Sequence, residues 1–164
     1  MLGTRPDISY AVIKMAQFAS NPSSDHMNNA KQILQYLNSS KDLSLVFNGS
    51  SDKGLIAFTD SDWASDKIMH KSQTGYFFQL AGASISWQSQ AQKTIALSST
   101  KAEYMASYDC CKQAKWIKTL LSKLGINVRP IPIHGDNQGS IFLGSNPVQG
   151  NRSKHINIQY HFIQ

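Results

Sequence analysis

The first part of the chain places apolar residues with the period of an α-helix. Between residues 4 and 37 they recur three or four positions apart, interrupted only by the polar run Asn21–Asp25. The apolar positions are Ile8, Val12, Met15, Phe18, Ala19, Ala30, Ile33, Leu34 and Leu37. Pro6 and Asp7 suit a helix start. We therefore expect a helical hairpin, and its apolar face needs a partner because short helices are unstable alone.

The pattern changes after a polar stretch at residues 38–52, which is rich in Ser, Asn and Lys. This stretch predicts a boundary between a helical segment, residues 1–52, and a second domain, residues 53–164. Leu43–Phe47, inside the boundary, could form a short strand.

Strands and a long helix follow the boundary. The sequence predicts three strands at Leu55–Asp60, Thr74–Leu80 and Ser84–Trp87, the last two joined by a tight turn at Ala81–Ala83. Ser98 then opens a helix with apolar residues at helical spacing from Ala102 to Leu124, and Gly125 ends it. The remaining expected elements are a strand at Pro130–His134, a short helix after Asp136, a loop at Gly144–Asn151 and a helical piece at Ser153–Gln164.

This order of elements predicts an α/β fold with a mixed sheet. Three antiparallel strands form a meander, and the long helix crosses over to a fourth strand that runs parallel to the first. The two parallel strands then end at one edge of the sheet, near the start of the helix. Three acidic residues stand there: Asp60 ends the first strand, Glu103 lies in the first turn of the helix, and Asp136 follows the fourth strand.

Carboxylates on the ends of rigid elements are ligands that Mg²⁺ prefers. Taken singly, Asp60, Glu103 and Asp136 are more readily explained as surface or capping acids, but together they predict a site for hard divalent cations. Two ions about 3.5–4 Å apart would activate a water molecule and stabilise the leaving oxygen of a phosphodiester. Asp62 is the nearest rival of Asp60, and we prefer Asp60 because it directly ends the apolar strand.

Composition narrows the class of protein. Hydrophobic residues make up 41% and charged residues 16%, and no apolar run approaches the roughly 20 residues of a membrane span, so we expect no membrane insertion. The start lacks the features of a secretory signal, and Cys110 and Cys111 are adjacent in a helix, where they cannot easily bridge. We therefore expect an intracellular protein, cytoplasmic or nuclear. The net charge of +6 suits a polyanionic partner.

Several blocks resemble the ribonuclease H domain of copia-type LTR retrotransposon Pol polyproteins. In chain order they are Phe58–Ala64, Ser72–Tyr76, Ile85–Ser89, Ala96–Ala106, Asp136–Gln138, Asn146–Pro147 and Lys154–Phe162. Before them, Thr4–Ala11 and Ile33–Leu37 resemble the tail of the neighbouring reverse transcriptase. The resemblance covers nearly the whole chain, and seven blocks in the family's order are far more specific than any one of them.

The resemblance implies a ribonuclease H-like fold and a function in reverse transcription. That function is Mg²⁺- or Mn²⁺-dependent cleavage of the RNA strand of an RNA–DNA hybrid, with two ions in the complete site and with the remainder of the reverse transcriptase as a partner. The family's metal-binding and catalytic carboxylates fall on Asp60, Glu103 and Asp136.

Polar and aromatic side chains add candidates for nucleic-acid contact. Short polar groups can hydrogen-bond the 2′-hydroxyls of an RNA strand. The candidates are Ser86, Gln88, Ser89, Ser98, Ser99 and Asn137, although helix capping alone would explain Ser98 or Ser99. Four aromatic residues could stack on bases, but we expect them in the core: Trp63, Tyr76, Trp87 and Trp116.

The sequence also departs from the family. The family's fourth carboxylate follows a fifth strand and has no counterpart up to Gln164, so we expect a C-terminally incomplete domain with weak or no cleavage. Lys101 stands where an acid is usual, and Asn157 replaces a common Asp. No Asp-Asp pair occurs, so we expect no polymerase activity. The alternatives are a catalytically inactive nucleic-acid-binding module and an inert product of a decayed transposable element.

Overall fold

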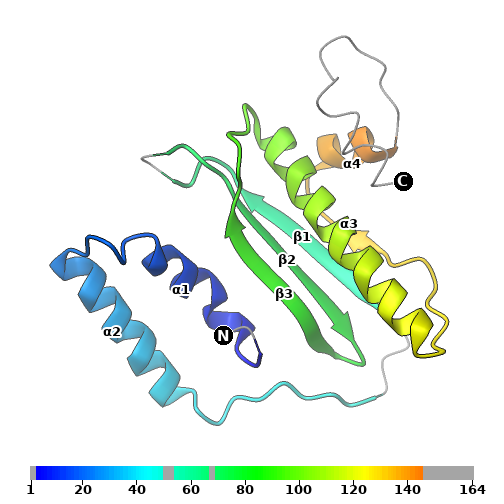
Figure 1. Ribbon diagram of the computed structural model, residues 1–164, viewed down its shortest axis with the longest axis horizontal. Helices are drawn as coiled ribbons and strands as arrows, with labels where there is room; N and C mark the ends of the chain where they lie inside the picture. The colour runs from blue at the N-terminus through cyan, green and yellow to red at the C-terminus, as the bar shows by residue number, and fades with distance from the viewer. Residues whose placement is uncertain (1–2, 50–53, 67–68, 146–164) are drawn as a thin grey trace.

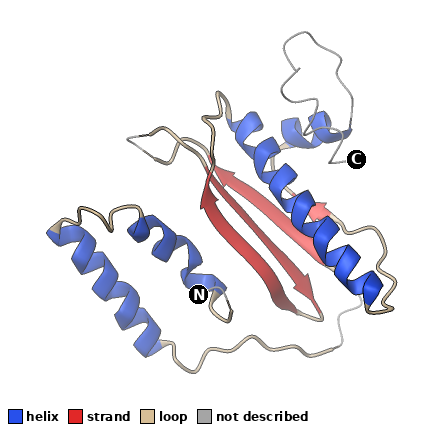
Figure 2. Ribbon diagram, in the orientation of Figure 1, coloured by secondary structure: helices blue, strands red, loops and turns tan. Residues whose placement is uncertain are grey.

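The computed structural model describes residues 3–49, 54–66 and 69–145, and it has two parts (Figure 1). One part is a four-stranded sheet with a long helix across one face, and the other is a pair of N-terminal helices that lies beside the sheet (Figure 2). The final helical piece predicted at Ser153–Gln164 lies outside the described residues, as does most of the predicted loop Gly144–Asn151. In the described ranges, no helix is long and apolar enough to cross a bilayer.

The predicted helical hairpin is confirmed. A short 3-10 helix, η1 (Pro6–Ile8), leads into α1 (Ser9–Ala16), and α2 (Ser24–Ser39) runs back beside it. Ser23 caps the start of α2. Its Oγ accepts a hydrogen bond from the His26 N–H, and His26 Nδ1 accepts one from the Ser23 N–H. This reciprocal pair satisfies two backbone amides at the N-terminus of the helix. No residue of α2 is buried, so this helix contributes little apolar burial to the fold.

The segment after α2 does not form the short strand considered for Leu43–Phe47. Its apolar side chains are exposed, at 61% for Leu43, 67% for Val46 and 57% for Phe47. An extended segment becomes a strand only when a neighbouring strand satisfies its backbone groups, and none of the described strands pairs with it. The possibility of a short strand at Leu43–Phe47 is therefore not borne out.

The mixed sheet matches the predicted topology. Its strands are β1 (Ile56–Asp62), β2 (Gln73–Leu80), β3 (Ala83–Ala91) and β4 (Ile133–His134), in the spatial order β3-β2-β1-β4. β1, β2 and β3 form the antiparallel meander, whereas β4 runs parallel to β1. Ala81 and Gly82 make the turn between β2 and β3 with φ angles of 52° and 86°, the left-handed pair that a two-residue hairpin requires.

β3 and β4 differ most in length from the prediction. β3 continues four residues past Trp87 to Ala91, because its polar residues still pair with β2. β4 is limited to two residues, since only Ile133 and His134 pair with β1.

The long helix α3 (Ser99–Lys123) covers one face of β1 and β2. Ser98 caps it by accepting from the Lys101 N–H at 3.2 Å, and Gly125 follows its end with a φ of 78°. The core between helix and sheet contains Leu55, Ala57, Phe78, Cys110, Ala114 and Ile117. A short helix, α4 (Gln138–Ser145), follows β4 and packs on α3.

The expectation that the aromatic residues lie in the core is wrong for two of the four. Trp63 is 50% exposed, and its indole Nε1 donates to the Ala96 carbonyl at 3.0 Å. Trp116 is 59% exposed on α3. Trp63 directly follows the last residue of β1, and the side chain of Trp116 projects about 100° around α3 from that of its buried neighbour Ile117. Tyr76 and Trp87, within the sheet, are partly buried.

Candidate metal centre

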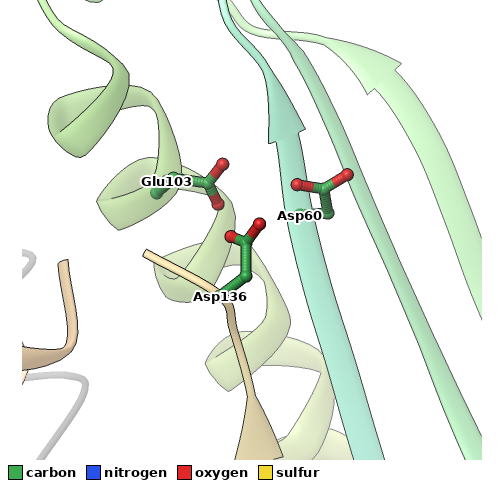
Figure 3. Close-up of side chains that lie close together, drawn as sticks. All are labelled: Asp60, Glu103 and Asp136. Atoms are coloured by element: carbon green, nitrogen blue, oxygen red, sulfur yellow. The ribbon is translucent and has the colours of Figure 1, made fainter. Parts of the chain in front are cut away.

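Asp60, Glu103 and Asp136 meet at one edge of the sheet (Figure 3). They come from β1, from α3 and from the residues that follow β4. One carboxylate oxygen from each lies within 4.8 Å of the others. Asp60 and Asp136 are exposed, whereas Glu103 is buried, with 7% of its surface accessible. The topology thus brings together three carboxylates that are far apart in the sequence.

The short length of β4 makes room for this cluster. β4 pairs with β1 only at Ala57 and Phe58, where the Ala57 N–H donates to the Pro132 carbonyl at 3.0 Å. Amides two residues apart on a strand point to the same side, so the Ser61 N–H points to the same edge, where β4 no longer pairs. The Ser61 N–H instead donates to Glu103 Oε1 at 3.1 Å. The carboxylate of Glu103 therefore takes the place of a missing strand partner.

Asp136 is held at the same edge by the start of α4. Asn137 caps that helix, because its Oδ1 accepts from the Ser140 N–H at 2.9 Å and its carbonyl accepts from Ser140 Oγ at 2.8 Å. Gly139 brings α4 close to α3, since a Cβ there would lie 3.1 Å from both Oγ1 and Cγ2 of Thr100. This close approach fixes α4, and with it Asp136, against the first turn of α3.

The cluster is electrostatically unfavourable without a cation. Burial raises the pKa of Glu103, and the neighbouring charges of Asp60 and Asp136 raise it further, although the hydrogen bond from Ser61 opposes them. Among the residues that the structure describes, none of the three carboxylates forms an ion pair with a lysine or arginine. A bound cation would offset this mutual repulsion.

The geometry fits a hard divalent cation with little adjustment. Two oxygens on one Mg²⁺, each at about 2.1 Å, can be at most about 4.2 Å apart. The three oxygens of Asp60, Glu103 and Asp136 lie within 4.8 Å of one another, so small side-chain movements would bring them into range. Ligands of this kind, all carboxylate oxygens, favour Mg²⁺, Mn²⁺ or Ca²⁺ over softer metals.

Asp62 is separated from this cluster. β1 continues to Asp62, so the expectation that Asp60 directly ends the strand was wrong by two residues: Ser61 and Asp62 still pair with β2. Asp60 nevertheless joins the group of three carboxylates, and Asp62 does not. Asp62 is exposed on the same strand and therefore offers a matched control for Asp60.

Most of the polar residues predicted to contact a hybrid make hydrogen bonds within the fold. Ser86 accepts from Gln113 Nε2, Ser89 accepts from Gln73 Nε2, and Gln88 donates to Gln90 Oε1. Ser98 and Asn137 cap helices. Ser99, at the start of α3, is exposed. Ser99 is therefore the member of this group most available to a ligand near the cluster.

An open cleft of about 570 Å³ lies on the other side of the sheet from α3. Its walls come from η1, α1 and the three long strands, and they include the stacked rings of Phe58 and Phe77 with Trp87. Asp60 and Asp62 also line the cleft. The sequence pattern gave no sign of this cleft, because it arises from the way in which the N-terminal helices lie beside the sheet.

Comparison with known proteins decides the family. The chain is 42% identical, over 98% of its length, to the retrovirus-related Pol polyprotein from transposon RE1 of Arabidopsis thaliana. It is also 42% identical, over 100% of its length, to the corresponding polyprotein from transposon TNT 1-94 of Nicotiana tabacum. The chain belongs to the copia-type, retrovirus-related Pol polyproteins. This confirms, at the level of the family, the resemblance seen in the sequence blocks.

The chain spans only 11% of the RE1 polyprotein and 12% of the TNT 1-94 polyprotein. A related sequence also occurs in a different setting: the secreted RxLR effector protein 161 of Plasmopara viticola is 41% identical over 71% of this chain, and the match covers 82% of that protein. No protein-family model matches the chain. No solved structure matches it either.

Proposed function

We propose that residues 53–164 are the ribonuclease H-like domain of a retrotransposon Pol polyprotein and that residues 1–52 are a remnant of the adjoining reverse transcriptase segment. The proposed activity is metal-dependent hydrolysis of the RNA strand of RNA–DNA hybrids. The convergence of Asp60, Glu103 and Asp136 within 4.8 Å is the observation that carries this proposal. A mixed sheet with a crossover helix is compatible with a ribonuclease H-like fold.

In this proposal Asp60, Glu103 and Asp136 would hold divalent cations next to the scissile phosphate. Two such ions would lower the pKa of the attacking water and stabilise the leaving oxygen. Ser61 keeps one Glu103 oxygen fixed through its backbone N–H, so that carboxylate needs no reorganisation when a substrate arrives. The exposed Asp60 and Asp136 face solvent, where a phosphate can approach. Ser99, exposed at the start of α3, is the candidate for contact with a 2′-hydroxyl.

The number of carboxylates limits the expected rate. Three gather among the described residues, whereas the family resemblance calls for four around two ions. A second ion would be held less firmly than the first, so the chain is expected to cleave slowly.

The test is a single-turnover assay with excess protein, a hybrid labelled on its RNA strand, and Mg²⁺ or Mn²⁺. We expect slow cleavage of the RNA strand alone, abolished by EDTA and by Asp60→Asn but retained in Asp62→Asn. Cleavage that survives Asp60→Asn would come from another site or a contaminant, and it would contradict the proposal. An RNA strand that stays intact with the wild-type protein would contradict the activity.

A nucleic-acid-binding module without chemistry is the second candidate, and the net charge of +6 favours it. Such a module would bind hybrid equally well in Asp60→Asn and would need no metal ion. Its affinity would fall steeply with salt, because each phosphate contact releases counterions. Weak, salt-insensitive association would instead fit an inert product of a decayed element.

A further inference from the structure

Gln92 is a buried polar residue that touches three parts of the fold. It follows β3 directly, and only 4% of its surface is exposed. Its backbone N–H donates to the Ser72 carbonyl at 2.8 Å, just before β2. Its side-chain Nε2 donates to Thr74 Oγ1 on β2 at 3.1 Å and to the Ala102 carbonyl in α3 at 2.9 Å. One amide group thus joins the sheet to the helix.

The bond to Ala102 acts next to the acidic cluster. Ala102 immediately precedes Glu103, whose Oε1 accepts from the Ser61 N–H. The first turns of α3 are therefore attached to the sheet at two neighbouring residues, through a carbonyl and through a carboxylate. Two attachments so close together fix both the distance of this helical turn from the sheet and its rotation about the helix axis, and this turn carries Glu103.

The side chain of Gln92 is not the best choice for stability alone. Its Oε1 is buried and has no hydrogen-bond partner among the described residues. A buried acceptor without a partner costs free energy that an apolar side chain of similar volume would avoid. An amide at this position is better explained by what its Nε2 holds than by packing.

We propose that Gln92 is a positioning residue for the carboxylate cluster, acting on Glu103 through the Ala102 carbonyl. The inference rests on the proposed metal function. Groups that orient metal ligands without touching the metal typically change its affinity by roughly ten- to a hundredfold when they are removed.

The chain offers a matched control in Gln73. This residue is also a glutamine with 4% of its surface exposed, and its Nε2 also donates to one hydroxyl, Ser89 Oγ, at 3.0 Å. That bond stays within the sheet, between β2 and β3. Gln92→Met and Gln73→Met therefore remove similar buried amides, but only Gln92→Met releases α3.

The experiment measures amide hydrogen exchange at Ser61 by NMR in metal-free protein, and Mn²⁺ affinity by calorimetry. In Gln92→Met we expect Ser61 to exchange about tenfold faster relative to β2 amides, and Mn²⁺ to bind about tenfold more weakly. Gln73→Met should leave both quantities near their wild-type values. If Gln92→Met gives no cooperative urea transition, Gln92→Leu replaces it in the same comparison.

Unchanged Ser61 exchange in the Gln92 variant would overturn the inference, whatever the metal affinity. Equal effects of the two glutamine substitutions would also overturn it, because the effect would then be general loosening of the sheet. Failure of the proposed function can be distinguished from failure of this inference. If the proposed function fails, the wild-type protein does not bind Mn²⁺ at all. The comparison of Ser61 exchange needs no metal and therefore still tests the attachment of α3.

Discussion

The sheet with α3 and the N-terminal helical hairpin are built by opposite means. Between α3 and the sheet lie fully buried apolar side chains such as Phe78 and Cys110, both at 0% exposure. In the hairpin, α2 buries no residue, and Leu34 is 65% exposed. Polar bonds contribute much of the hairpin's attachment: Arg5 donates to Asp7 and to Ser40 at the end of α2.

The acidic cluster depends on the core between α3 and the sheet. Asp60, Glu103 and Asp136 all come from elements that pack on the core between α3 and the sheet or directly follow them. The hairpin supplies none of the three carboxylates. Changes in the core should therefore affect the cluster, and changes in the hairpin should not.

The largest effect is expected from Phe78→Ala, which leaves a cavity where a fully buried ring was. We expect a loss of about 3–5 kcal/mol in the free energy of unfolding, measured by urea denaturation. Metal binding by the cluster should weaken in parallel as the folded fraction falls. A loss below about 1 kcal/mol would mean that α3 is not packed as described.

The cysteines of α3 report on the same core. Burial raises the pKa of Cys110 to about 12 and that of Cys111 to about 11. The reactive thiolate is therefore scarce near neutral pH, and in the folded protein both thiols should react with a disulfide reagent roughly a hundredfold more slowly than in denaturant. Rapid reaction of Cys110 in the folded protein would contradict its burial between α3 and the sheet.

The hydrogen bonds that Arg5 and Tyr36 donate to Asp7 should make the stability of the hairpin depend on pH. The hydrogen bonds from Arg5, followed by the one from Tyr36, lower the pKa of Asp7 from its usual 3.8 to about 2. Because the folded pKa is the lower one, this attachment contributes fully above about pH 4 and is lost as the pH falls towards 2. NMR titration of Asp7 should give the low midpoint, and Arg5→Ala should raise it towards the usual value, with the hydrogen bond from Tyr36 still holding it lower. A normal midpoint in the wild-type protein would refute the attachment.

The smallest effect is expected from Leu34→Ala on α2. Because this side chain is mostly exposed, the free energy of unfolding should change by no more than about 0.5 kcal/mol. Mn²⁺ affinity should not change. A destabilisation comparable with that of Phe78→Ala would show that the two regions share one core after all.

The convergence of Asp60, Glu103 and Asp136 could be predicted from the sequence because topology, rather than local pattern, brings these residues together. Three strands, a crossover helix and a parallel fourth strand put the ends of β1 and β4 at one edge, and Glu103 follows from its place in the first turn of α3. The end of β1 was misjudged because Ser61 and Asp62 look like a polar turn, yet they still pair with β2.

Three other features of the structure could not be predicted from a single sequence. Gln92 resembles any polar residue after a strand, and only its bonds to Thr74 and Ala102 reveal its place. The exposure of Trp63 and Trp116 contradicts the usual preference of tryptophan for partly apolar surroundings. The cleft beside Phe58 depends on how α1 lies against the sheet, which no periodicity encodes.

The most direct test of the cation site is a calorimetric titration of the purified chain with Mn²⁺. We expect saturable binding in the wild-type protein, loss of binding in Asp60→Asn and in Glu103→Gln, and wild-type binding in Asp62→Asn. If Mn²⁺ does not bind, or if Asp62→Asn loses binding as fully as Asp60→Asn, the three carboxylates do not form the site that their geometry indicates.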